Sequence, residues 1–172
     1  MITEVVREVY GEGHASEESV EAFRDMIYYC IELLLKLSVE DATKKGARRI
    51  TPLNIKDGLE SNQSLCDSLF RIPNEGVPKV VDESKLQKSY EKQIYNILVR
   101  INMGFGISEK AMRIMNLFVN DFVIANINTT LTLQNPENPR ELTYNIVLEA
   151  FQKNYSPDLY KNAFLYYKNS EI

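Results

Sequence analysis

The fold expected for this chain depends most on one stretch, GISEKAMRIMNLFVND at residues 106–121. Its third residue, Ser108, is a good helix N-cap, because a serine hydroxyl can accept a hydrogen bond from a free amide of the first helical turn. After Ser108 the apolar residues recur at steps of three and four, which is the spacing of one face of an α-helix. The pattern therefore predicts a long amphipathic helix from Ser108 to about Leu133, with an apolar stripe formed by Met112, Met115, Phe118, Val119, Phe122 and Val123.

Shorter helices are predicted on both sides of this long one. Tyr90–Ile101 has an apolar face and is separated from the long helix by Gly104-Phe105-Gly106, a break that favours a turn. After the long helix, Asn135–Pro139 stops the periodicity, and Tyr144–Phe151 again has helical spacing. A further helix, Asp158–Lys168, is rich in tyrosine and phenylalanine. The second half of the chain is thus expected to form short, long and short helices followed by one extra helix.

The first half repeats this order of elements. Ile2–Tyr10 is short and amphipathic, and Gly11-Glu12-Gly13 breaks it. A long helical stretch with one apolar stripe follows from about Ser16 to Lys45. Thr51-Pro52 then supplies an N-cap residue and a proline at the first helical position, so Pro52–Leu59 is predicted to be a short helix.

The two halves together predict an all-α protein. A short–long–short triplet cannot close a hydrophobic core alone, because the apolar stripe of its long helix needs a second triplet to cover it. Residues 1–84 and 85–172 would supply that cover to each other within one chain. The segment from about Ile72 to Gln87 is the natural connector, and its valines and lack of serine or glycine runs predict an ordered segment.

Charge is divided unevenly between the halves. The chain of 172 residues has a formal net charge of −4. Residues 1–84 carry 10 Lys and Arg against 16 Asp and Glu, whereas residues 85–172 carry 10 against 8, so the balances are −6 and +2. Binding to a polyanion would therefore depend on local cationic clusters and not on an overall basic field.

Several classes of protein are not expected. No apolar run approaches the roughly 18 residues of a membrane helix, and the first residues do not form a signal peptide. Cys30 and Cys66 are too few for a disulfide framework or a four-thiolate zinc site, and Cys30 is expected to be a buried free thiol in a reducing compartment. His14 is expected in an exposed loop, without a nucleophile or metal ligands. Gly104-Phe105-Gly106 lacks the Lys-Ser/Thr of a nucleotide-binding loop. Neither an enzyme nor a cofactor is expected.

The stretch at residues 106–121 closely resembles histone two-B, from its first loop into its central helix. Ser89-Tyr90 and Tyr95–Leu98 resemble the first helix of that histone. Pro157–Lys168 lies where histone two-B has its extra C-terminal helix. The match is long and specific, and it covers most of the second half.

The first half resembles histone two-A more faintly. Arg49–Ile55 is similar to the second loop and third helix of that histone, and Ser61–Leu69 falls where its next short helix lies. Gly76-Val77-Pro78 is similar to its docking segment. Fused histones of this kind resemble those of giant DNA viruses, where such a doublet partners a second doublet similar to histones three and four.

The resemblance implies two tandem histone folds, one in residues 1–84 and one in residues 85–172, that pair as an intramolecular heterodimer. It also implies a structural role: wrapping double-stranded DNA without base-specific contacts, in a nucleosome-like particle built with the partner doublet. Virion, viral factory and host nucleus all remain open as locations. Neither a membrane nor a small-molecule substrate is implied.

The resemblance further implies where DNA would bind, because the first loop of one histone fold lies beside the second loop of the other. Phosphates need cations and free helix N-terminal amides at such a loop pair. One edge would combine Arg48, Arg49, Thr51, Ser108 and Lys110, reinforced by Lys44 and Lys45. The other edge would combine Arg140, Thr143 and the loop around His14, and the first helices could add Arg7, Lys92 and Arg100. Without the resemblance, such loop cations would more often be simply solvated, and Thr51 and Thr143 would be helix caps.

Three departures from the family keep other interpretations open. Both basic tails are absent from this sequence, and the second edge is only weakly basic. The acidic patch of histone two-A is largely missing, since its positions are occupied by Tyr28, Leu33, Lys36, Asn62, Gln63 and Ser64. The alternative is therefore an acidic regulatory histone-fold module, or a specialised variant, that acts mainly through protein contacts. A third interpretation, an unrelated helical bundle, would make the histone-like motif a coincidence.

Overall fold

The computed structural model describes residues 2–71, 82–134, 137 and 140–170. The described part of the chain is mostly helical, which confirms the all-α prediction. Two strands of two residues each are the exception: β1 (Arg49–Ile50) and β2 (Gly106–Ile107). The helices are α1 (Ile2–Tyr10), α2 (Glu17–Lys44), α3 (Pro52–Glu60), α4 (Gln63–Leu69), α6 (Glu83–Leu86), α7 (Glu91–Ile101), α8 (Glu109–Thr132), α9 (Tyr144–Asn154) and α10 (Pro157–Ser170).

The ends of the two long helices lie where the capping residues predict them. The Ser16 hydroxyl accepts a hydrogen bond from the amide of Ser19 at the start of α2, at 3.2 Å. The Ser108 hydroxyl accepts one from the amide of Ala111 at the start of α8, also at 3.2 Å. Gly46, with φ of +74°, follows the last turn of α2 and allows the chain to reverse.

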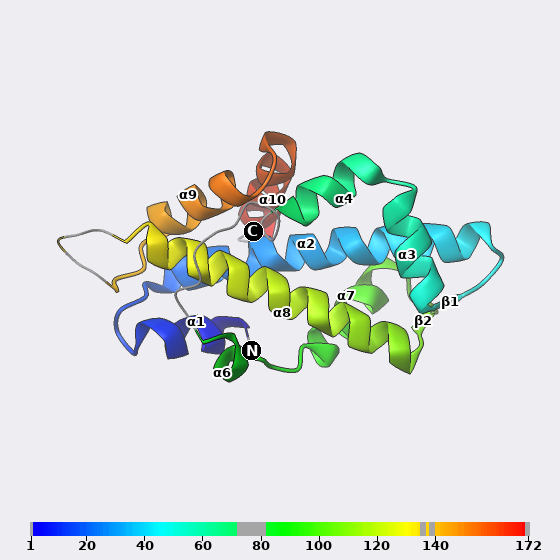
Figure 1. Cartoon of the computed structure of the whole chain (residues 1–172), viewed down its shortest axis with the longest axis horizontal. Helices are drawn as coiled ribbons and strands as arrows, with labels where there is room; N and C mark the ends of the chain where they lie inside the picture. The colour runs from blue at the N-terminus through cyan, green and yellow to red at the C-terminus, as the bar shows by residue number, and fades with distance from the viewer. Residues whose placement is uncertain (1, 72–81, 135–136, 138–139, 171–172) are drawn as a thin grey trace.

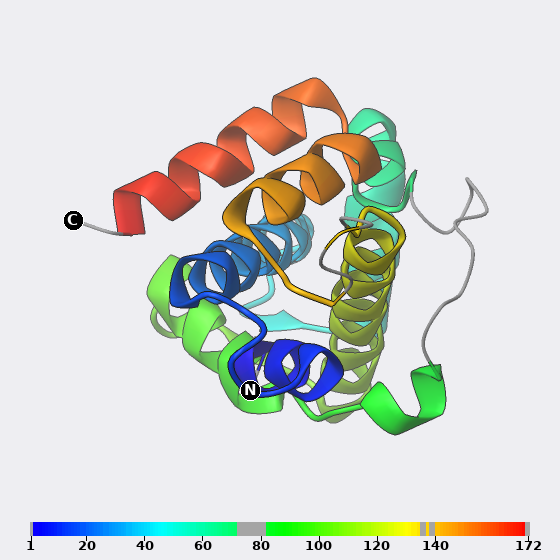
Figure 2. The same cartoon turned by 90° about the vertical axis from the view of Figure 1, so that its left-hand side faces the viewer.

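The long helices α2 and α8 lie next to each other and run in opposite directions through the middle of the molecule (Figure 1). The end-on view in Figure 2 shows α1 and α7 on one side of this pair and α9 and α10 on the other. Each half of the chain therefore contributes one long helix and shorter helices that pack around the pair.

One hydrophobic core is shared between the two halves. Phe23 of α2 packs edge to face against Phe151 of α9, with ring centroids 5.7 Å apart, and both are fully buried. The Tyr10 hydroxyl of α1 donates a hydrogen bond to Thr130 Oγ1 of α8 at 2.7 Å, across 120 positions of sequence. Neither half could keep these groups out of water without the other.

A buried polar network lies inside this core. Asn126 donates to the Tyr155 hydroxyl at 2.7 Å, and Asn154 donates to Asn126 Oδ1 at 3.1 Å and to Thr129 Oγ1 at 2.8 Å. The network reaches Cys30 of α2, whose side chain hydrogen-bonds with Tyr155. Burial raises the pKa of the Cys30 thiol to about 12. The prediction that Cys30 is a buried free thiol is confirmed.

Two asparagines one turn apart on α8 hydrogen-bond to the segment that precedes α7. Asn120 Oδ1 accepts from the amide of Lys88 at 2.9 Å, and its Nδ2 donates to the Lys88 carbonyl at 2.8 Å. Asn116 Oδ1 accepts from the amide of Tyr90 at 2.6 Å. These side chains therefore bond to backbone groups that precede α7 and so lack helical partners.

Two sequence expectations fall partly outside the described residues. Of the connector 72–87, the structure describes only residues 82–87, where α6 forms; the docking-like Gly76-Val77-Pro78 is not among them. Of the predicted helix stop at Asn135–Pro139, only Glu137 is described. None of the helices in the described part of the chain combines the length and apolar character needed to cross a membrane.

The stability of the shared core should depend on pH through Tyr10. Burial raises the pKa of Tyr10 to about 12, so the unfolded chain ionises this tyrosine near pH 10 while the folded chain holds its proton until about pH 12. The corresponding stability is present below pH 10 and is lost as the pH rises towards 12. We expect the free energy of unfolding, measured by urea titration, to fall less steeply over this range for Tyr10→Phe than for the wild type.

The control for this experiment is Tyr95→Phe, because Tyr95 lies on α7 with 52% of its surface exposed. Its pH dependence should match that of the wild type. Equal slopes for the Tyr10 and Tyr95 variants would contradict the assignment.

Candidate nucleic-acid interface

The two halves join at one end of the molecule through a short parallel pairing of β1 with β2. Arg49 lies opposite Gly106, and Ile50 lies opposite Ile107. The amide of Gly106 donates to the carbonyl of Arg48 at 2.9 Å, and the amide of Ser108 donates to the carbonyl of Ile50 at 2.9 Å. This pairing brings the loop after α2 against the loop before α8, as the resemblance implies. We call this region, residues 44–51 and 102–110, the β1–β2 end.

Exposed cations gather at the β1–β2 end. Arg48 and Arg49 are exposed, and within the described residues neither is in an ion pair. Lys44, at the end of α2, and Lys110, in the first turn of α8, are also exposed. The first turn of α8 adds backbone amides at the positive end of a helix dipole. Four of the predicted phosphate-binding cations are therefore accessible at the same end of the fold.

Lys45 differs from these cations because the protein itself neutralises it. Its ammonium lies 2.9 Å from Asp41 Oδ2 and also contacts Asp57 Oδ2. The hydrogen bond to Asp57, followed by that to Asp41, raises the pKa of Lys45. Lys45 joins the end of α2 to α3, so a phosphate would have to compete with two carboxylates for its charge.

Thr51 is the N-cap residue of α3, and its hydroxyl is already used within the protein. The hydroxyl donates to Asn54 Oδ1 at 2.9 Å, and the Thr51 amide donates to the same oxygen at 2.8 Å. Asn54 in turn donates to Asp41 Oδ2 at 3.0 Å. Ser108 likewise caps α8. Both predicted residues therefore fix helix N-termini at the β1–β2 end.

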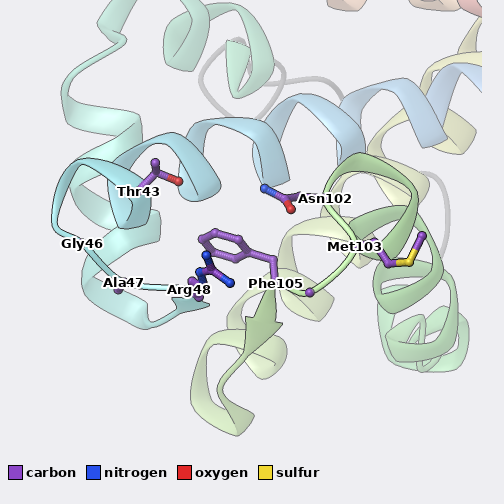
Figure 3. A pocket seen from close by; sticks show the side chains of 8 residues that line it. Thr43, Gly46, Ala47, Arg48, Asn102, Met103 and Phe105 are labelled. Atoms are coloured by element: carbon purple, nitrogen blue, oxygen red, sulfur yellow. The ribbon is translucent and has the colours of Figure 1, made fainter.

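A cleft of about 500 Å³ opens beside these cations (Figure 3). Arg48 and the ring of Phe105 both line it. Four residues of this cleft, Asn102–Phe105, come from the loop between α7 and β2, of which the sequence pattern indicates only a helix break at Gly104-Phe105. The cleft is lined by Thr43, Gly46, Ala47, Arg48, Asn102, Met103, Gly104 and Phe105.

The opposite end of the molecule has a similar loop pairing. Ala15 and Leu142 form a parallel bridge, in which the Leu142 amide donates to the His14 carbonyl at 2.7 Å. His14 is exposed, as predicted. The Thr143 hydroxyl accepts from the amide of Ile146 at 3.3 Å and so caps α9. The predicted neighbourhood of His14 and Thr143 is therefore present; we call it the Ala15–Leu142 end.

Arg140 is the cation of this second end, and its backbone is strained. Its φ is +77°, a value that side-chain-bearing residues rarely adopt. The conformation is held by a hydrogen bond from the Arg140 amide to Gln134 Oε1 at 2.6 Å, and Gln134 donates to the Tyr10 hydroxyl at 2.9 Å. Arg140 is exposed at this position.

Carboxylates outnumber cations around the Ala15–Leu142 end. Among the described residues, the two loops and the first turn of α2 carry five exposed acidic side chains, namely Glu12, Glu17, Glu18, Glu137 and Glu141. A phosphate backbone lying there would be repelled by these charges at short range. The two ends are therefore similar in backbone pairing and opposite in the sign of their charge.

The three cations predicted on the first helices are not equivalent. Arg7 and Lys92 are exposed on α1 and α7. Arg100 instead lies over the ring of Tyr166 on α10, 5.9 Å from its centroid, and 3.9 Å from Glu32 Oε1. Its guanidinium is thus shared with protein groups, which makes it the weakest of the three candidates for binding phosphate.

The chemistry available at the β1–β2 end is anion binding. The guanidinium groups can donate hydrogen bonds to phosphate oxygens, and the lysines add charge. Among the described residues no group of His, Cys, Asp and Glu is arranged to hold a metal ion.

No protein-family model matches this chain. No solved structure matches it either.

Proposed function

We propose that this protein is a fused pair of histone-like units that binds the backbone of double-stranded DNA without sequence preference. The short–long–short order of α1, α2 and α3, and again of α7, α8 and α9, supports this proposal. So does the resemblance of residues 106–121 to histone two-B. The units would pair within the chain as an intramolecular heterodimer.

The observation that carries the proposal is the parallel joining of loops from the two halves at both ends. At the β1–β2 end it unites Arg48 and Arg49 from one half with Lys110 and the first turn of α8 from the other. Neither half alone contains this combination of cations and helix amides. An interface assembled in this way recognises a backbone of phosphates and makes no use of base edges.

Within this proposal, a doublet similar to histones three and four completes a nucleosome-like particle of the kind found in giant DNA viruses. The particle would lie in a virion, a viral factory or a host nucleus. The chain would act structurally and would need no cofactor.

The test is nuclease protection of long duplex DNA after salt-gradient assembly with a doublet that resembles histones three and four. We expect a discrete protected fragment that is longer with this chain than with the partner doublet alone. A fragment of unchanged length would exclude a wrapping role.

A second candidate function is supported by the acidic Ala15–Leu142 end. A regulatory histone-fold module would use this end for protein contacts and would not bind DNA at both ends of the fold. Such a module would enter a complex with the partner doublet, seen by size-exclusion chromatography, and leave the protected fragment unchanged. The same assembly therefore separates the two candidates.

A further inference from the structure

The loop between α7 and β2 ends in a tip whose outermost side chain is apolar. Met103 is 85% exposed, and no other large hydrophobic side chain in the described residues is as exposed. Its neighbours Asn102 and Gly104 are exposed as well. Single exposed apolar side chains are common, so the surroundings of Met103 decide whether it has a role.

The tip is held in place by the fold beneath it. The Phe105 ring is buried, with 7% exposure, and its amide donates to the Asn102 carbonyl at 3.2 Å to close a turn. Gly104 has φ of +106°, which favours glycine, and an added Cβ there would meet nothing within 4 Å. The next amide, of Gly106, is fixed to Arg48 by the β1–β2 pairing. Met103 is therefore presented by an ordered turn with open space around it.

Met103 and Arg48 line the same cleft at the cationic end of the molecule. In Figure 3 the Arg48 side chain lies inside the cleft, whereas the Met103 side chain points away from it, at its outer rim. A methionine gains nothing from phosphate groups. The faces of stacked bases, in contrast, offer it an apolar surface once a base step begins to open.

We propose that Met103 is an apolar wedge for duplex DNA bound at the β1–β2 end. From the rim of the cleft its side chain enters the minor groove and partly unstacks one base step, which bends the duplex. An apolar side chain inserted between base steps is a general way to bend DNA. Pyrimidine–purine steps, which deform most easily, are the preferred sites. This inference rests on the proposed function, because it needs DNA at this surface.

The experiment uses a duplex in which 2-aminopurine replaces the adenine of a single central TA step, bound at low salt. Unstacking of this base raises its fluorescence. We expect the wild type and Met103→Leu to raise the emission at least about twofold, and Met103→Ser to leave it near the value of free DNA. The affinity of Met103→Ser should stay within about fivefold of the wild type, since the phosphate contacts remain.

The matched control is Leu117→Ser, which replaces an apolar residue on α8 that is 60% exposed and lies outside the β1–β2 end. It should raise the emission as the wild type does. Binding without a rise in emission for the wild type, or an equal rise for Met103→Ser, overturns the wedge and leaves the proposed function standing. Failure of the wild type to bind duplex DNA at low salt overturns both.

Discussion

The Arg48→Glu/Arg49→Glu protein is expected to bind duplex DNA at least about tenfold more weakly than the wild type at low salt. Both guanidiniums are exposed at the β1–β2 end, next to Lys110 and the first turn of α8. Removing them loses two phosphate contacts, and the added carboxylates repel the backbone. Because phosphate contacts release counterions, the slope of log K against log salt should also become shallower by about 2.

The measurement is a fluorescence-anisotropy titration of a labelled duplex at several salt concentrations. The control is Lys153→Glu/Lys161→Glu, which changes the net charge equally at exposed positions on α9 and α10. If charge alone decided binding, both double variants would lose the same affinity. Equal losses would therefore contradict a DNA site at the β1–β2 end.

The Phe151→Ala protein is expected to lose about 3–5 kcal/mol of unfolding free energy. Phe151 belongs to the second half of the chain, and its ring packs on Phe23 of the first half. The substitution therefore opens a cavity in the core that joins the halves. Urea unfolding followed by circular dichroism should show one cooperative transition at a lower midpoint.

Leu117→Ala provides the comparison, because this exposed position should change the unfolding free energy by no more than about 0.5 kcal/mol. Two separate transitions in the Phe151→Ala protein, with the first half unaffected, would contradict a shared core. The wild type should likewise unfold in a single step.

Most of the helical framework could be predicted from local signals. Ser16 and Ser108 mark the starts of α2 and α8, because an N-cap needs only the residues of the first turn. The predicted helix ends are less accurate: the sequence pattern predicts that α9 ends at Phe151, whereas the helix continues to Asn154. The fourth helix begins at Gln63, two residues later than expected. Such ends depend on packing against other helices, which sequence periodicity does not contain.

The candidate site was predictable in part. Arg48 and Arg49 could be chosen as loop cations, and the resemblance placed them beside Ser108. The neutralisation of Lys45 could not be predicted, because Asp57 reaches it only when α3 folds back against α2. The exposure of Met103 could not be predicted either, because an apolar residue beside a glycine-rich turn is equally compatible with burial.

The shared core has a consequence for how the protein behaves on dilution. When two separate chains form such a pair, the fraction that is paired and folded falls as their concentration falls. Here α2 and α8 belong to one polypeptide, so each is always present at a high effective concentration near the other. The midpoint of unfolding should not change with protein concentration, and free halves cannot exchange partners. A protein built in this way keeps its two halves in a fixed one-to-one ratio, even where it is scarce.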